Sequence, residues 1–258
     1  MRINLEVGNG WGKIVFQSEN GMNLLNSSTI HELRLITQEL KNTAGLRVLS
    51  LRSEGNVFGA GGDLTCFVSN DAETQQRILA AVSELNQAIL NLHQLPALII
   101  CAVHGVVAGG SMGVMNAADL VIAAKGTRFN TGYCKIGASP DAGSSWFLPK
   151  LVGFRKAMEL LILSENFDAE AAREMGLVNW VVPAEQLIDV ADKLMGRLLH
   201  GPQQSYLQIK RLLAMAEHHE LSSHLEQEQQ ALSEIVKGPD FCEGVQALLE
   251  NRGPHFKE

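Results

Sequence analysis

The chain has 258 residues, of which 46% are hydrophobic and 19% charged, and its formal net charge at pH 7 is −7. A chain of this length buries roughly three quarters of its unfolded surface, enough for one large core with or without an appended subdomain. The acidic balance argues against a nucleic-acid partner, and every apolar run is far shorter than the ~20 residues of a membrane span. The first residues lack the apolar segment of a secretory signal, so we expect a cytoplasmic protein with no membrane partner.

Short strands alternate with helices in the first two thirds of the chain. Strands are predicted over residues 2–7, 13–17, 47–52, 98–103 and 120–124. The last two are apolar throughout, which is typical of strands buried on both faces. Helices are predicted over 28–41, 72–92 and 110–118, and in the longest of them Ile78, Val82 and Leu85 recur at the spacing of a helix face. This alternation predicts an α/β fold.

After Pro183 the sequence carries only helical patterns. Helices are predicted over 185–199, 203–216, 221–236 and 241–250, and Gly201-Pro202 and Gly238-Pro239 mark breaks between them. We therefore divide the chain into a core of residues 1–199 and a helical C-terminal subdomain of residues 200–258.

Two glycine-rich turns interrupt the core, F-G-A-G-G-D-L at 58–64 and H-G-V-V-A-G-G-S-M-G at 104–113. Each follows a predicted strand and precedes a helix-compatible segment, so bare backbone N–H groups can point at a ligand beside a helix N-terminus. Taken alone, each turn is equally consistent with plain packing. Brought together, the two turns would offer a pair of N–H donors to one oxygen, which is the geometry of an oxyanion hole.

With their flanking residues, both turns resemble the crotonase (enoyl-CoA hydratase/isomerase) superfamily. The first matches the pattern F-x-A-G-x-D-L and the second N/H-G-x-x-x-G-G-G, and further matches at 140–153, 172–183 and 243–256 extend the resemblance over nearly the whole chain. The resemblance implies a spiral of ββα units with a helical C-terminal subdomain that serves oligomerisation and covers the active site. It also implies an acyl-CoA substrate, a homotrimer or dimer of trimers, and no cofactor apart from the coenzyme A of the substrate.

The same resemblance implies which residues bind the thioester. The N–H groups of Gly62 and Gly110 would hold its carbonyl oxygen, and Ala60 with its neighbours Gly61, Asp63 and Leu64 would contact the substrate. Asp63, at a turn before a helix, more often caps that helix than acts as an acid or base.

Contacts to coenzyme A are less well defined. Lys210 and Lys257 could meet its phosphates, although solvated lysines on helix faces are commoner. Met22 stands where the family generally carries a basic residue that helps to hold coenzyme A.

The chain departs from the hydratases of this family at two catalytic positions. Those enzymes use two glutamates, and here the corresponding residues are Gly113 and Tyr133. Glycine has no side chain and tyrosine titrates near ~10, so neither can take a proton from water at neutral pH. We expect Tyr133 to form a pocket wall or to donate a hydrogen bond to the substrate.

Asp141 is the remaining candidate for the acid/base. It follows Pro140 in a turn that resembles the isomerase branch containing the phenylacetate-pathway isomerase, where an aspartate at this position moves the proton. One carboxylate suffices for a 1,3-proton shift through a dienolate. The alternative is that Asp141 caps a helix beginning near Ala142. We therefore predict a double-bond isomerase of an unsaturated acyl-CoA; the alternatives are a catalytically silent acyl-CoA-binding homologue and a hydratase with an unrecognised base.

Other chemistries find little support in the sequence. Ser111 lies in a turn similar to the nucleophile turn of Clp-type serine peptidases, but no histidine falls between His104 and His200 to activate it. Cysteine and histidine spacings indicate no metal site. We expect the four cysteines to be reduced and mostly buried.

Overall fold

The computed structural model describes residues 2–69, 71–216 and 219–256, which form two sheets. The larger sheet has the strand order β1-β2-β3-β4-β6-β9. Its strands are β1 (Arg2–Gly8), β2 (Trp11–Gln17), β3 (Val48–Ser53), β4 (Leu98–Val103), β6 (Leu120–Ala124) and β9 (Trp180–Val182). β1 is antiparallel to β2, and every other neighbouring pair is parallel. The smaller sheet has the order β5-β7-β8 and consists of β5 (Val106–Ala108), β7 (Arg128–Asn130) and β8 (Phe167–Asp168).

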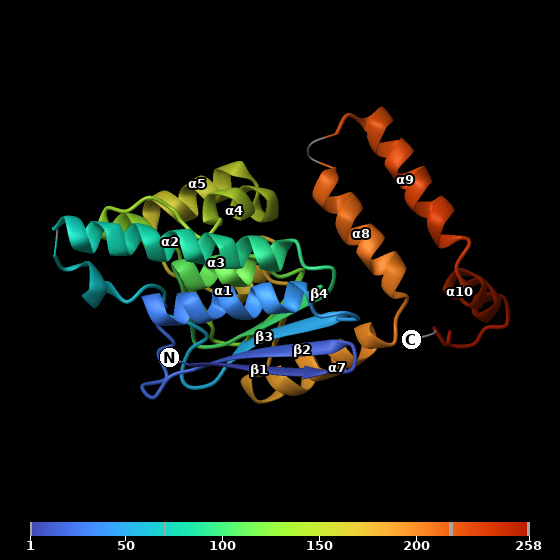
Figure 1. Cartoon of the computed structure of the whole chain (residues 1–258), viewed down its shortest axis with the longest axis horizontal. Helices are drawn as coiled ribbons and strands as arrows, with labels where there is room; N and C mark the ends of the chain where they lie inside the picture. Colours follow the sequence, from blue (N-terminus) through green and yellow to red (C-terminus); the bar gives the residue numbers. More distant parts are fainter. Residues whose placement is uncertain (1, 70, 217–218, 257–258) are drawn as a thin grey trace.

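Helices cover both faces of the larger sheet (Figure 1). α1 (Ser27–Lys41), α2 (Ala72–His93) and α3 (Gly110–Asn116) lie on one face, and α7 (Leu187–Leu199) lies on the other. On β4, Ile99, Cys101 and Val103 belong to the core that contains the apolar residues of α1 and α2, whereas Ile100 and Ala102 pack with those of α7. Alternate side chains of this strand thus enter two cores, which explains its uninterrupted apolar sequence.

Shorter elements fill the connections. They are the helices α4 (Ser144–Val152), α5 (Phe154–Leu163) and α6 (Ala169–Glu174) and the 3-10 helices η1 (Leu64–Phe67), η2 (Tyr133–Ile136) and η3 (Ala184–Gln186). The sequence patterns did not predict α5, α6, β5, β7, β8 or β9, because short segments carry too little periodicity, and a helix near α4 was considered only as the alternative beginning near Ala142. The predicted strands at 98–103 and 120–124 are confirmed at their bounds, and the other predicted elements are found with ends shifted by one or two residues.

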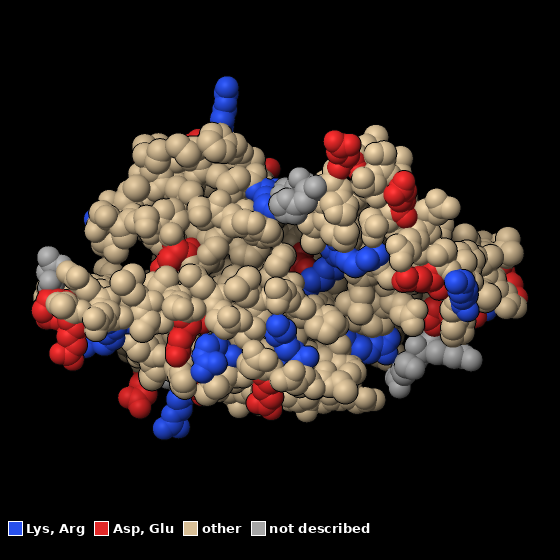
Figure 2. Space-filling model, turned by 45° about the horizontal axis from the view of Figure 1, so that its top comes forward, with Lys and Arg blue, Asp and Glu red and all other residues tan. Residues whose placement is uncertain are grey.

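The C-terminal helices extend to one side of the main body (Figure 1). They are α8 (Gln203–Met215), α9 (Leu221–Ile235) and α10 (Pro239–Leu249). Gln203 ties α8 to the body by donating from Nε2 to the Arg47 carbonyl at 3.0 Å. Figure 2 shows Lys and Arg side chains gathered where these helices meet the body. α7 ends at Leu199, and the division into units 1–199 and 200–258 stays a prediction. None of the helices in the described ranges is both long and apolar enough to cross a bilayer.

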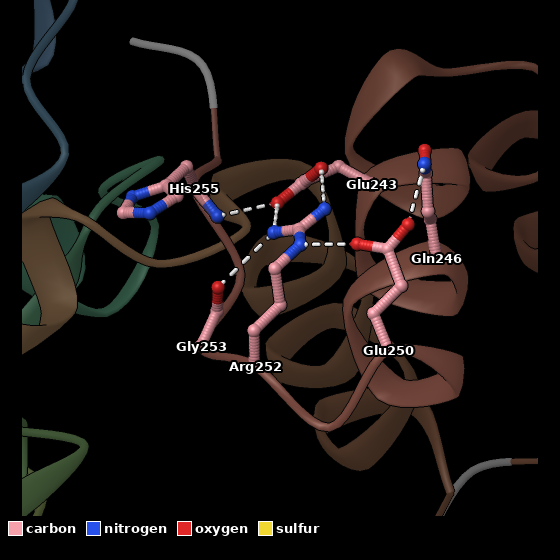
Figure 3. A network of polar contacts seen from close by, with 6 residues as sticks. All are labelled: Glu243, Gln246, Glu250, Arg252, Gly253 and His255. Carbon is pink, nitrogen blue, oxygen red and sulfur yellow. Dashed lines mark hydrogen bonds and ion pairs between the residues drawn. The ribbon is translucent and has the colours of Figure 1, made fainter.

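An ion-pair network folds the C-terminal tail back onto α10 (Figure 3). The Arg252 guanidinium donates to both carboxylate oxygens of Glu243, at 2.6 and 3.0 Å, and to Glu250 Oε2 at 2.6 Å. The His255 backbone N–H donates to Glu243 Oε1 at 2.7 Å. Hydrogen bonds from Arg252 and the His255 amide lower the pKa of Glu243 to about 2. The tail is therefore held by one arginine and two carboxylates, those of Glu243 and Glu250.

Replacing Arg252 should release this tail without unfolding the helix beneath it. In Arg252→Gln the Glu243 carboxylate loses its charged partner, so we expect faster hydrogen exchange at the Gly253, His255 and Phe256 amides. Arg173→Gln, which breaks an exposed Arg173–Glu170 pair elsewhere, is the control and should leave these amides unchanged. In the wild type the Glu243 contribution is present above the unfolded-state pKa and is lost as the pH falls toward about 2. Equal protection of the tail in both variants would contradict the role of Arg252.

Candidate active site

The two glycine turns lie against each other at one edge of the larger sheet. The first follows β3 and the second follows β4, and because these strands are parallel neighbours their carboxyl ends share an edge. The Gly59 N–H donates to the Val106 carbonyl at 3.1 Å, and the Ala108 N–H donates to the Gly59 carbonyl at 3.0 Å. Gly61 has φ +90°, and a Cβ there would lie 3.1 Å from the Ala108 carbonyl oxygen. The approach of the turns therefore requires glycine at this position.

This packing brings to the wall of one cavity two glycines whose N–H groups have no hydrogen-bond partner in the described part of the chain. Leu25 pairs with the first turn, since its N–H donates to the Gly61 carbonyl and its own carbonyl accepts from the Asp63 N–H. Gly62 lies between these contacts, and Gly110 is the first residue of α3. Neither the Gly62 N–H nor the Gly110 N–H has a hydrogen-bond partner among the described residues. Both are thus available to an oxygen atom, and their role as an oxyanion hole stays a prediction.

The cavity itself is narrow, with a volume of about 60 Å³, and mostly apolar. Asp141 lies in its wall together with Gly62 and Gly110. A Cβ built on Gly110 would be 4.0 Å from Asp141 Oδ1. The remaining lining residues are Leu25, Asn26, Ser27, Ile30, Asp63, Cys66, Phe67, Arg77, Ile78, Ala81, Val82 and Leu85. One carboxylate and two free N–H groups therefore meet in a cavity with apolar walls, a setting in which charge on a bound oxygen is strongly stabilised.

Asp141 does not cap a helix. α4 begins at Ser144, its N-cap is Gly143 with φ +74°, and no side chain caps it. The alternative prediction that Asp141 caps a helix near Ala142 is therefore wrong, because Ala142 and Gly143 both have left-handed backbone angles. The carboxylate instead accepts a hydrogen bond from the Tyr133 hydroxyl at 2.8 Å. Burial raises the pKa of Asp141, and the Tyr133 hydrogen bond opposes part of that rise.

Tyr133 lies behind Asp141 rather than in the cavity wall. Its side chain is buried on η2, and its hydroxyl also lies 2.9 Å from Ser144 Oγ. Burial and the neighbouring Asp141 raise the pKa of this hydroxyl, which keeps it protonated. We expected Tyr133 to form a pocket wall or to donate a hydrogen bond to the substrate. In the structure it donates a hydrogen bond to the Asp141 carboxylate instead. No sequence pattern indicated that Ser144 belongs to this group.

The other residues expected to contact substrate are divided between the cavity and its surroundings. Asp63 lies at the cavity, where its carboxylate accepts from the Thr65 N–H at 3.1 Å and hydroxyl at 2.6 Å and so caps η1. Ala60, Gly61 and Leu64 are not among the cavity-lining residues.

Lys210 is not brought to the cavity. Its ammonium forms an ion pair with Asp119 Oδ2 at 2.8 Å and donates to the Ala97 carbonyl at 2.9 Å. It lines a groove of about 730 Å³ between the end of α2 and α8. Lys257 lies outside the described residues.

The structure also shows the surroundings of the residues that were considered as a serine nucleophile or as metal ligands. Ser111 is 3% exposed and its hydroxyl lies under Gly59, so it is closed to a peptide substrate. Within the described ranges no cluster of three His, Cys, Asp or Glu side chains could hold a metal ion.

Of the free cysteines, Cys101 is buried, Cys66 is partly buried, and Cys134 and Cys242 are exposed. The expectation that most are buried is therefore wrong.

Pocket shape was expected to depend on residues 65–73 and on the helix from Gln75 to Leu92, and the cavity residues Cys66, Phe67 and Arg77 lie in these segments without having been named individually. Phe67 packs near Gly62, since a Cβ there would lie 3.4 Å from its ring. The helical spacing of Ile78, Val82 and Leu85 did identify the face of α2 that forms the wall. Extending that face back by one residue would have included Arg77.

The chain resembles known proteins over its whole length. Residues 6–258 match the family model described as enoyl-CoA hydratase/isomerase. A probable enoyl-CoA hydratase of Rhodobacter capsulatus is 32% identical over 98% of this chain and 97% of its own. The 1,2-epoxyphenylacetyl-CoA isomerase of Escherichia coli is 31% identical over 91% of this chain and 90% of its own.

Solved structures agree with these relatives. The crystal structure of an enoyl-CoA hydratase from Bacillus anthracis has a TM-score of 0.90 and 28% identity, and the match covers 100% of this chain and 99% of that one. The predicted crotonase-like α/β fold with a helical C-terminal region is thereby confirmed. The chain belongs to the enoyl-CoA hydratase/isomerase family.

Proposed function

We propose that the protein is a double-bond isomerase of unsaturated acyl-CoA thioesters. One observation carries the proposal: Asp141 is the carboxylate that lies beside Gly110, in a cavity that also holds the Gly62 N–H. The only other carboxylate lining the described cavity belongs to Asp63, which is bound to Thr65. The similarity to the E. coli isomerase supports an isomerase that acts on a CoA thioester, although the substrate in that protein's name is an epoxide.

The reaction follows from this arrangement. The thioester carbonyl oxygen accepts from the Gly62 and Gly110 N–H groups, and the Asp141 carboxylate removes a proton from C2 of a 3-enoyl thioester. The C–H electron pair then forms a dienolate whose negative charge rests on the thioester oxygen. Asp141 returns the proton to C4, so the double bond moves to C2–C3. Each oxyanion donor is worth about 3–4 kcal/mol in comparable sites, and the carboxylate contributes about 10²–10⁴-fold.

The contacts around Gly113 argue against hydration by paired carboxylates. A Cβ built on Gly113 would overlap the carbonyl oxygen and the Cβ of Ala142. Ala142 comes this close because its φ is +48°, which turns the chain toward α3. A glutamate therefore has no room at the first hydratase position. Tyr133 occupies the second and stays protonated.

We also propose a trimer-based assembly formed through the C-terminal helices. Large apolar side chains at 39–79% exposure cover these helices in the isolated chain, and such patches mark association surfaces. They are Ile209, Leu213, Leu221, Leu225, Leu232, Val236, Phe241, Val245, Leu248 and Leu249.

Sedimentation velocity tests the assembly. We expect the wild type to sediment as three or six chains of 28.1 kDa. Leu213→Glu places a charge in the proposed interface, at a side chain 71% exposed in the single chain, and should release smaller species. Leu35→Glu on α1, where the side chain is 49% exposed, is the matched control. A wild type that sediments as a monomer would contradict the proposal, and so would an assembly whose sedimentation is unchanged by Leu213→Glu.

Two helical glycines test the packing that excludes a carboxylate from position 113. Gly113→Ala should destabilise the fold by about 1–3 kcal/mol, because the new Cβ overlaps the Ala142 backbone. Gly196→Ala in α7 meets nothing within 4 Å and should stabilise by up to about 1 kcal/mol through helix propensity. Urea denaturation of both variants gives the comparison. Equal effects would show that α3 can move away from the 140–142 turn.

Asp141→Asn tests the isomerase directly. We expect kcat for 3-enoyl-CoA to fall by about 10²–10⁴-fold with KM nearly unchanged, because the amide keeps the shape but cannot carry the proton. Conjugated product absorbance and deuterium uptake at C2 and C4 in heavy water report the reaction. Asp189→Asn, an exposed change on α7, is the control. In the wild type, activity should rise with pH through a pKa above the ordinary ~3.9 of aspartate, since burial raises it and the base works ionised.

Three outcomes would overturn this assignment. Wild-type turnover in Asp141→Asn would remove Asp141 as the base. Absence of isomerisation and exchange with every 3-enoyl-CoA would favour a catalytically silent acyl-CoA-binding protein. Hydration of crotonyl-CoA by the wild type near ~10 s⁻¹, the typical kcat of enzymes, would favour a hydratase with an unrecognised base.

A further inference from the structure

Two buried hydroxyl groups stand in line behind Asp141. Tyr133 comes from η2 and is 6% exposed, and Ser144 is the first residue of α4 and is 1% exposed. Tyr133 Oη lies 2.8 Å from Asp141 Oδ1 and 2.9 Å from Ser144 Oγ. The three side chains therefore form a continuous chain of hydrogen bonds that ends at the cavity.

The donor and acceptor properties of the three groups determine the direction of these hydrogen bonds. An ionised carboxylate only accepts, so the single Tyr133 proton points toward Asp141. The Asp141 carbonyl oxygen is a second acceptor for the same hydroxyl, at 3.3 Å. Because the Tyr133 hydroxyl donates its proton to Asp141, the Ser144 hydroxyl is the donor in the hydrogen bond to Tyr133 Oη. The order of donation is Ser144 to Tyr133 to Asp141.

The orientation of the Asp141 carboxylate depends on this hydrogen bond. Asp141 precedes two left-handed residues and makes no helix cap, so its own backbone N–H is the local backbone group that supports the carboxylate, and Tyr133 supplies the side-chain hydrogen bond. The other charged or titratable groups lining the described cavity are engaged elsewhere or carry weak donors. Asp63 is bound to Thr65, the Arg77 guanidinium donates to the Cys66 carbonyl, and Cys66 carries a thiol.

We propose that Tyr133, supported by Ser144, is a positioning residue that holds Asp141 Oδ1 and keeps the carboxylate ionised and directed at the thioester beside Gly110. The inference rests on the proposed function of Asp141 as proton carrier. Tyr133 touches no substrate atom and acts through the carboxylate alone. Tyr133 stands at the position that a catalytic glutamate occupies in the hydratases, but it positions a carboxylate and does not itself transfer a proton to the substrate.

Tyr133→Phe removes the hydroxyl and keeps the ring. We expect kcat for 3-enoyl-CoA to fall by about 10- to 100-fold, the effect of a misplaced catalytic group, with KM within about twofold of wild type. Without the donor the ionised carboxylate is less stable, so the acidic limb of the kcat–pH profile should move to higher pH. A merely structural role would not move that limb.

Two further variants sharpen the test. Ser144→Ala should shift the limb in the same direction by a smaller amount, because Tyr133 keeps its own hydrogen bond. Tyr206→Phe changes the other of the two tyrosines in the chain, on α8 away from the cavity, and should leave kcat and the pH profile unchanged. Circular dichroism and thermal melting confirm that each variant is folded. If Tyr133→Phe does not fold, Ser144→Ala decides, and an unmoved limb in that variant overturns the inference.

A double variant separates this inference from the proposed function. Because Tyr133 acts through Asp141, adding Tyr133→Phe to Asp141→Asn should cause no further loss. A wild-type kcat and pH profile in Tyr133→Phe, with Asp141→Asn impaired, would overturn the positioning role alone. Full activity in Asp141→Asn would overturn the proposed function. Additive losses in the double variant would show that Tyr133 acts independently of the carboxylate.

Discussion

The backbone contact between the two glycine turns is the constraint on which the site depends. The hydrogen bonds that join Gly59 to Val106 and Ala108 fix the turns side by side at the carboxyl edge of β3 and β4. Only a chain without a Cβ at Gly61 can come this close to the Ala108 carbonyl. The same contact places Gly110, the first residue of α3, at the cavity, where the Asp141 carboxylate also lies. The cavity is thus defined first by main chain and only then by side chains.

Close packing beside this contact also limits which side chains the site can hold. α3 is buried at every position, and its Gly113 lies directly against the Ala142 backbone. The turn at 140–142 therefore replaces a side chain of α3 as the element that can present a carboxylate. The left-handed Ala142 thus follows a carboxylate that is carried by a loop, and the buried hydroxyls of Tyr133 and Ser144 are neighbours of that loop.

Much of the fold could be predicted because the decisive signals are local. Uninterrupted apolar runs located β4 and β6, and the order of strand and glycine turn indicated that the two turns could come together, as they do. What depends on backbone angles or distant partners could not be predicted. The helix expected near Ala142 begins at Ser144, because two residues in left-handed conformations delay it. The place of Lys210 beside Asp119 is set by the docking of α8, which no pattern within that helix encodes.

The long connection between β6 and β9 carries Asp141, and its ends are joined by sheet pairing. Asn179 Oδ1 accepts from the Val121 N–H across 58 residues, and Ile122 pairs with Trp180. Closing such a loop costs conformational entropy that grows only logarithmically with its length, by about 0.6 kcal/mol for each doubling. Residues added at an exposed turn such as Gly153 would therefore change this entropy very little. The connection can lengthen or shorten there during evolution while its carboxylate remains at the cavity.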